Sequence, residues 1–299
     1  MLTSQTWFRF SLRTLLVAVA LFGVWLGLRV NAARRQAQAV VEIRNQRGGS
    51  VYYDFESKAE NPADAKSWVP SWIISRTGPD LFHSVVSARM DHLVASEIGD
   101  LDVLEARRPW DKAKVVAEVR RHLAALPRIR RLDLCVWPEV SEQCLAAVGA
   151  FSKLDSLYCT YATDAGVAHL ESQHRLKSVH MDDSKLTDES LRIFGKLSRL
   201  ELLQATRNHF TDDGLAHLRQ LNRLICLDID CGETRFTDAG LVHLESLQCL
   251  QRIYLQRTYV TPVGAARLKR AIPSLEYVLV TPPPPYVSAL GDADPFASP

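Results

Sequence analysis

The sequence predicts an α/β solenoid of short parallel strands and short helices, preceded by an N-terminal transmembrane helix. Two observations predict this fold. A unit of similar length recurs through the second half of the chain, and an uncharged apolar run lies near the N-terminus. The composition is that of a folded protein, since 47% of the 299 residues are hydrophobic and 23% are charged.

The charge and cysteine content exclude several protein classes. Lys and Arg total 36 against 34 for Asp and Glu, so the formal net charge of +2 gives no sign of a nucleic-acid-binding protein. Six cysteines without a CxxC pair are too few for a disulfide scaffold. We therefore predict no nucleic-acid partner.

Residues 1–30 are predicted to form a single-pass membrane anchor. The uncharged run Thr14–Leu28 lies between Arg13 and Arg29. As a helix it would span about 22 Å, which is short of the ~30 Å hydrocarbon core of a bilayer. Extending the helix over Phe8–Val30 gives roughly 34 Å, provided that the arginine side chains reach outward to the headgroups.

A cleaved signal peptide is the alternative for the same segment. Arg9 and Arg13 would form its basic start, and Val30-Asn31-Ala32 resembles a small-residue cleavage site. Arg29 argues against cleavage there, because its charge lies between the apolar run and that site. The flanking charges leave the side of the membrane open, although the larger number of arginines after the run favours a cytoplasmic repeat domain.

Residues 31–49 are expected to continue the anchor as a juxtamembrane helix. Good helix formers fill residues 31–47, and Gly48-Gly49 is a strong stop signal. The arginines of this segment are interspersed with Gln and Ala. A solvated stalk is therefore the better interpretation than a polybasic lipid-binding helix.

Residues 50–128 are predicted to cap the N-terminal end of the solenoid, because a solenoid end exposes apolar core. A strand is expected at 50–55 and a loop at 56–70. A small buried cluster is expected from the apolar side chains that follow, namely Trp68, Trp72, Ile73 and Ile74.

The rest of the cap carries a strand, an insertion and a helix. A strand is expected at 86–90, with Val86, Ala88 and Met90 on one face, and a long loop is expected at 91–110. A helix at 111–126 has an apolar stripe and ends before Pro127.

The repeat domain is predicted at residues 129–282. Each unit begins with an apolar-x-x-apolar-x-apolar pattern, continues with a polar turn and ends in a short helix. Stacked units are expected to form one parallel sheet over one continuous core. The leucines that open successive units lie 22 to 26 residues apart, at Leu154, Leu176, Leu200, Leu224, Leu250 and Leu275.

Thr-Asp pairs precede several of the short helices. We expect both side chains of a pair to accept backbone N–H bonds at the N-terminus of the helix that follows. A glycine stands shortly after many of these pairs, for a reason that the sequence alone does not show. The pairs begin at Thr163, Thr187, Thr211 and Thr237.

These residues resemble the leucine-rich repeat family, whose unit of about 20 to 29 residues contains a strand and a helix. The TDAGLxHL segments are similar to those of F-box-type adaptors and of many bacterial repeat proteins. With the anchor, the chain resembles bacterial membrane-anchored leucine-rich repeat proteins, which implies a single-pass protein of the bacterial inner membrane. No F-box-like segment is recognisable, so a role in protein degradation is not implied. The Pro-rich residues 283–299 are expected to form a disordered tail.

No catalytic, cofactor-binding or metal-binding residues are predicted. The sequence contains no GxSxG, GxxxxGK[ST], HExxH or GxGxxG motif, and no segment places a nucleophile beside a base. His169, His217 and His243 recur at one helix position, but repeat duplication explains this without a metal. We predict a non-enzymatic protein without a small-molecule substrate. A hydrolase or metal protein that uses the insertion at 91–110 is the alternative class.

The concave face of the sheet is the predicted binding surface. Side chains alternate along a strand, so the residues beside the buried leucines point to this face. Tyrosines there offer contact area, and aspartates can select a basic protein or peptide. The alternative to this binding function is a structural or envelope-associated protein that acts as a spacer or self-associates. One column of the face contains Asp133, Tyr158, His180, Gln204, Asp228 and Tyr254, and the next contains Asp182, Asp230 and Gln256.

Overall fold

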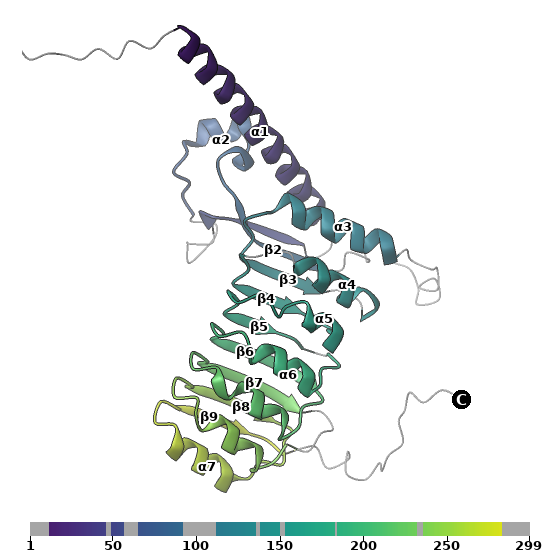
Figure 1. Ribbon diagram of the computed structural model, residues 1–299, viewed down its shortest axis with the longest axis vertical. Coiled ribbons are helices and arrows are strands. Elements are labelled where there is room, and N and C mark those ends of the chain that lie inside the picture. Colours follow the sequence, from purple (N-terminus) through teal and green to yellow (C-terminus); the bar gives the residue numbers. More distant parts are fainter. Residues whose placement is uncertain are drawn as a thin grey trace, which may run out of the picture.

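The computed structural model describes residues 12–45, 49–56, 65–91, 112–135, 138–149, 153–182, 184–231 and 236–282. One nine-stranded sheet runs through these ranges, and its strands lie side by side in sequence order. β1 pairs antiparallel with β2, and every later strand pairs parallel with the one before it. Figure 1 shows the strands stacked along the long axis of the molecule, with the repeat helices along one side of the sheet. The predicted α/β solenoid is confirmed.

The elements are short, apart from the first helix. The strands are β1 (Ser50–Tyr53), β2 (Val85–Asp91), β3 (Arg131–Cys135), β4 (Ser156–Cys159), β5 (Ser178–His180), β6 (Leu202–Asn208), β7 (Cys226–Cys231), β8 (Arg252–Gln256) and β9 (Tyr277–Val280). The α-helices are α1 (Leu12–Asn45), α2 (Ser71–Thr77), α3 (Lys112–Ala125), α4 (Pro138–Val148), α5 (Asp164–Ala168), α6 (Asp188–Phe194) and α7 (Pro262–Ala271). The described 3-10 helices are η3 (Pro79–Leu81), η5 (Gly214–Gln220) and η6 (Gly240–Leu244).

Helix α1 begins in an exposed apolar stretch and ends against the cap. The large apolar side chains of residues 16–28 are between 41% and 66% exposed, whereas Ala39, Val40 and Ile43 are buried. By length and composition, α1 is long and apolar enough to cross a membrane. The solvated stalk predicted for residues 31–47 is wrong, because a side chain of this segment is buried at nearly every turn, beginning with Gln36.

The buried cluster predicted around the cap tryptophans is also wrong. Trp68 is 75% exposed and Trp72 is 63% exposed. No residue of α2 is buried, so Ile73 and Ile74 do not reach the core either. The sequence pattern misleads here because a short run of apolar residues has the same appearance on a surface as in a core.

A β-bulge moves one predicted core residue of β2 to a half-buried position. Tyr52 pairs with Ser87, whereas Tyr53 pairs with Val85. Val86 is therefore the extra residue in β2, and Val85 takes the buried position that we predicted for Val86.

The cap helix α3 covers the N-terminal end of the core. Its buried stripe contains Val115, Val119 and Leu123, and Leu126 follows it. The predicted loop at 91–110, apart from Asp91 at the end of β2, and the predicted tail at 283–299 lie outside the described residues.

One hydrophobic core extends from Ala39 of α1 to Leu275 before β9. Cys159 and Ala205, which replace a strand leucine, are fully buried in it. The central residues of the strand patterns are buried and stand in register across the sheet, namely Leu132, Leu157, Val179, Leu203, Leu227 and Ile253.

The Thr-Asp pairs join neighbouring repeats. Thr163 caps its own helix, since its Oγ1 accepts a bond from Gly166 N at 3.2 Å. The role predicted for the aspartates is wrong, because the Asp164 carboxylate reaches the next repeat. It accepts bonds from Thr187 N at 3.0 Å and from Thr187 Oγ1 at 2.7 Å. The same two bonds join Thr211 to Asp188, Thr237 to Asp212 and Thr261 to Asp238.

The glycine three residues after such a threonine leaves room for the carboxylate of the preceding repeat. A Cβ atom on Gly214 would lie 2.0 Å from Asp188 Oδ1, and one on Gly264 would lie 2.1 Å from Asp238 Oδ1. Both distances are far below van der Waals contact. Close packing between repeats, rather than backbone conformation, therefore explains glycine at these positions.

Candidate functional site

The first predicted column of the sheet face is in register across neighbouring strands. Asp133 of β3 pairs with Tyr158 of β4, and Tyr158 pairs with His180 of β5. The row continues through Gln204 of β6 to residues 228 and 254 of β7 and β8. These side chains are partly exposed, while their neighbours along each strand are buried. The structure thus brings the six residues together on one face.

Polar and aromatic contacts connect the first half of this row. Arg89 of β2 lies beside it, with Nε 3.0 Å from Asp133 Oδ2. The rings of Tyr158 and His180 have centroids 5.9 Å apart. His180 Nδ1 lies 3.2 Å from Gln204 Oε1. The ion pair with Arg89 reduces the acidic character that the sequence suggested for this end of the face.

The second column is only partly described. Asp182 follows β5, and its Oδ1 accepts a bond from Thr206 Oγ1 at 2.6 Å. Its Oδ2 lies 3.2 Å from Gln204 Nε2, so this residue links the two columns. The backbone of Asp230 pairs with that of Gln256 across β7 and β8. The side chain of Asp230 lies outside the described part of the structure.

The far end of the face is aromatic. The rings of Tyr254 and Tyr277 have centroids 5.3 Å apart on β8 and β9. Arg89 and Asp133 thus lie at one end of the face and a tyrosine pair at the other, with amide, imidazole, hydroxyl and carboxylate groups between them. Such a surface can donate and accept hydrogen bonds along its whole length while it buries aromatic area.

The described solenoid is a leucine-rich repeat fold. An internalin from Listeria monocytogenes is 15% identical over 52% of this chain and 42% of its own, with a TM-score of 0.40. A second internalin of that species is 23% identical over 54% of this chain and 64% of its own, with a TM-score of 0.40. A leucine-rich repeat protein from Leptospira interrogans is 18% identical over 53% of this chain and 45% of its own, with a TM-score of 0.36. The chain spans less than two thirds of the length of each of these proteins.

No family model and no curated protein matches the sequence. The repeat architecture is therefore assigned from the strand register and the continuous core of this chain.

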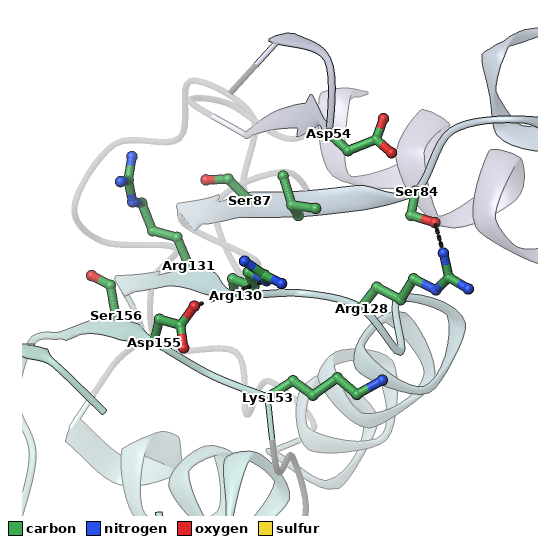
Figure 2. Close-up of a pocket in the computed structure, with 10 residues that line it drawn as sticks. Asp54, Ser84, Ser87, Arg128, Arg130, Arg131, Lys153, Asp155 and Ser156 are labelled. Carbon is green, nitrogen blue, oxygen red and sulfur yellow. Dashed lines mark hydrogen bonds and ion pairs between the residues drawn. The ribbon is translucent and has the colours of Figure 1, made fainter. Parts of the chain in front are cut away.

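A basic pocket lies beside the cap, where the chain enters strands β2 to β4. It has a volume of about 570 Å³ and is lined by Arg128, Arg130, Arg131 and Lys153, with Asp155 among them (Figure 2). Arg130 Nε lies 3.9 Å from Asp155 Oδ2. Together with Asp54, the wall holds four cationic groups and two carboxylates, so it can accept a carboxylate or phosphate group.

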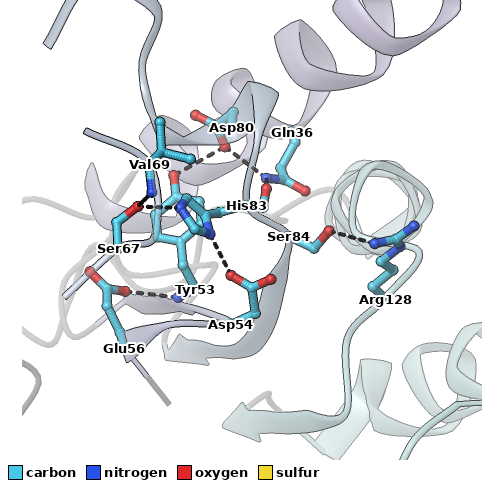
Figure 3. Close-up of polar contacts among 10 residues, drawn as sticks. All are labelled: Gln36, Tyr53, Asp54, Glu56, Ser67, Val69, Asp80, His83, Ser84 and Arg128. Carbon is cyan, nitrogen blue, oxygen red and sulfur yellow. Dashed lines mark hydrogen bonds and ion pairs between the residues drawn. The ribbon is translucent and has the colours of Figure 1, made fainter. Parts of the chain in front are cut away.

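A buried histidine connects three segments of the cap. His83 Nδ1 lies 2.8 Å from Asp54 Oδ1, and His83 Nε2 lies 2.7 Å from Ser67 Oγ (Figure 3). Because an ionised carboxylate only accepts hydrogen bonds, we place the ring proton on Nδ1, which leaves Nε2 to accept from the Ser67 hydroxyl. This is the order of groups in a serine hydrolase triad, and no local sequence motif marks it.

The surroundings of Ser67 favour a structural role. Its Oγ already accepts a bond from Val69 N at 2.9 Å. Ser67 lines neither the basic pocket nor the two cavities beside α1. The His83 side chain is fully buried, and its ring packs on that of Phe55 with centroids 4.5 Å apart. The three residues thus join the end of β1, the segment before α2 and the start of β2.

The same cluster fastens α1 to the cap. Gln36 Nε2 donates to Asp80 Oδ1 and to His83 O, both at 2.9 Å (Figure 3). Tyr53 Oη donates to the same Asp80 oxygen at 3.0 Å. Burial and the nearby Asp80 carboxylate raise the pKa of Tyr53 above its ordinary value, so this phenol stays protonated.

A group with metal-ligand chemistry lies between α1 and α3. Ligand atoms of Glu42, Glu118 and His122 lie within 4.8 Å of one another. The Arg121 guanidinium already compensates these carboxylates, with Nη2 2.7 Å from Glu42 Oε2 and 3.5 Å from Glu118 Oε1. His122 Nε2 lies 2.6 Å from Glu42 Oε2. The arrangement is an ion-pair network that docks α3 on α1.

Sequence reasoning missed the basic pocket and the histidine cluster for different reasons. The arginines at residues 128, 130 and 131 form a visible charge run before a strand, which could have indicated the pocket. Asp54, Ser67 and His83 come from separate segments without a shared spacing. Only the fold brings them together.

Proposed function

We propose that this chain is a membrane-anchored, non-enzymatic leucine-rich repeat protein that binds a protein or peptide through the exposed face of its sheet. The observation that carries the proposal is the row of half-buried side chains that runs in register from β3 to β8. Solenoid proteins use extended faces of this kind to bind partners. The residues that we assign to binding are Asp133, Tyr158, His180, Asp182, Gln204, Asp228, Asp230, Tyr254 and Gln256.

The chemistry of the face indicates the kind of partner. Asp133 is paired with Arg89, and Asp182 accepts bonds from neighbouring side chains, so a strongly basic partner would find little free acidity at these two residues. The tyrosines favour a polypeptide that offers apolar side chains and backbone hydrogen-bonding groups. A folded protein or an extended peptide meets this requirement.

We propose that the first part of α1 crosses the bacterial inner membrane. Leu12–Arg29 would span about 27 Å as a helix, close to the ~30 Å hydrocarbon core. The exposed apolar side chains of residues 16–28 support this proposal, because such a patch is unfavourable in water.

Site-specific photo-crosslinking in cells tests the binding face. A photoreactive amino acid replaces Tyr254 on the face or, as the matched control, Val242 on helix η6, which is 50% exposed on the helix side. We expect a discrete adduct with a different protein at position 254 and none at 242. An adduct with a second copy alone would support the self-associating spacer instead. Equal crosslinking at both positions, or none, would refute the assigned face.

A separate experiment tests the anchor. A compartment-sensitive reporter is fused after Pro299, and the membrane fraction is extracted with alkaline carbonate and sized. A full-length product that resists extraction is expected, and the reporter gives the side. A soluble product about 32 residues shorter would show that the segment is a signal peptide.

A further inference from the structure

Two exposed tryptophans lie on the cap, away from the binding face. Trp68 is 75% exposed, although its ring makes T-shaped contacts with Phe82 and His83, with centroids 6.3 Å and 6.0 Å apart. Trp72 is 63% exposed on α2. Indole rings of this exposure are costly in water and are enriched where a membrane meets water.

Helix α2 lies at the level where α1 leaves its exposed apolar stretch. Only Gly78 separates α2 from η3, and η3 packs on α1. A small cavity between η3 and α1 is lined by Arg29, Ala32 and Ala33 of α1 and by Asp80 and Leu81 of η3. In the view of Figure 1, α2 is drawn at the height of the middle of α1. The apolar residues 16–28 end at this level, so α2 stands at the predicted edge of the hydrocarbon.

The charges around this level have the sign that a phospholipid surface attracts. Arg29, Arg34 and Arg35 are exposed on α1, and Arg76 is exposed on α2. The Arg29 guanidinium lies 5.9 Å from the centroid of the Trp25 ring. Arginines that flank an apolar span and stand beside tryptophans are typical of the headgroup region.

Helix α2 also has little support from the protein, where only Ile73 and Ile74 are half-buried. It has seven residues, none of them buried, and its N-cap makes no side-chain hydrogen bond. Isolated helices of this length are unstable in water, because nucleation costs more than a few hydrogen bonds return. A bilayer interface would supply the missing apolar contact to Trp72, Ile73 and Ile74.

We propose that α2 and Trp68 bind the interfacial region of the same bilayer that α1 crosses. This inference rests on the proposed anchor and adds a second point of membrane contact. Two contacts fix the rotation of the cap about the axis of α1, whereas a single span would leave it free. Because the cap and the repeats share one core and one sheet, the binding face would have a fixed direction relative to the membrane.

Fluorescence quenching by brominated lipids tests the proposal on the full chain. The chain has six tryptophans, and five are replaced by Phe to leave either Trp72 or Trp25 alone. As a matched control, all six are replaced and Val263→Trp is added, since Val263 is 73% exposed on α7 at the far end of the solenoid. Each chain is reconstituted in phosphatidylcholine–phosphatidylglycerol vesicles brominated near the headgroups or near the bilayer centre. Circular dichroism melting checks that the three chains fold alike.

The results separate the proposal from the anchor on which it rests. We expect Trp72 to lose more emission with shallow bromines than with deep ones, Trp25 to be quenched in both vesicles, and Val263→Trp to keep its emission. Quenching of Trp25 with Trp72 as bright as the control would overturn the α2 contact and leave the anchor intact. An unquenched Trp25 would overturn both.

Discussion

The carboxylate that joins the last repeats offers a quantitative test of the packing. Asp238 Oδ1 accepts from Thr261 N at 2.8 Å, and Asp238 Oδ2 accepts from Thr261 Oγ1 at 2.6 Å. A Cβ on Gly264 would lie 2.1 Å from Asp238 Oδ1 and 2.3 Å from its Cγ. Gly264→Ala must therefore push the carboxylate out of its site, and its main cost should equal that of Asp238→Ala.

The magnitudes follow from these contacts. Hydrogen bonds to a charged group contribute about 1.5–3 kcal/mol each, and we take ~2 kcal/mol for the two together because both partners reach solvent. Gly264→Ala loses the same ~2 kcal/mol but regains up to ~1 kcal/mol, because alanine is favoured over glycine within a helix. In the double variant the carboxylate bonds are lost only once (~2 kcal/mol), and alanine again returns up to ~1 kcal/mol of helix stability. The double variant should therefore lower the free energy of unfolding by about 1 kcal/mol, whereas independent effects of the two single variants would add to ~3 kcal/mol.

Thermal unfolding of the full chain in nanodiscs, followed by circular dichroism, measures these differences. For a solenoid of this size, 1 kcal/mol corresponds to roughly 2–4 °C in Tm. Asp213→Ala is the matched control, because Asp213 is exposed and its side chain makes no capping bond. It should change the free energy of unfolding by less than about 0.5 kcal/mol. Additive losses in the double variant would refute the packing argument for glycine.

Three further predictions concern the cap. The hydrogen bond from His122 is the main cause that lowers the pKa of Glu42 below its ordinary value of 4.5. The stability that ionised Glu42 contributes is therefore present above pH 4.5 and is lost as the pH falls through the lowered pKa. The drop in Tm on acidification should be smaller in Glu42→Gln than in the native chain, and equal drops would contradict this. A fluorophosphonate probe should leave Ser67 unlabelled while His83→Ala lowers Tm, and covalent labelling at Ser67 would instead reveal a hydrolase site. Millimolar phosphate should raise the Tm of the native chain but not that of Arg131→Glu/Lys153→Glu, and an equal shift in both would exclude anion binding at the basic pocket.

The repeat, and with it the sheet and the core, can be predicted from the sequence alone. The spacing of leucines such as Leu200 and Leu224 defines the period, and alternation along a strand decides which neighbours stay exposed. The first column of the face could therefore be predicted residue by residue, because equivalent positions of stacked repeats must come into register.

The way in which the repeats and the cap are joined depends on contacts between segments that are distant in sequence. Asp164 and Thr187 are far apart in sequence, and local capping rules assign the carboxylate to its own helix rather than to the next repeat. Trp72 shows the same limit, because an apolar residue carries no sign of whether protein or membrane will cover it. Local sequence patterns reflect the conformational preferences of residues that are neighbours in the chain. Contacts between distant segments depend on where the folded chain places those segments.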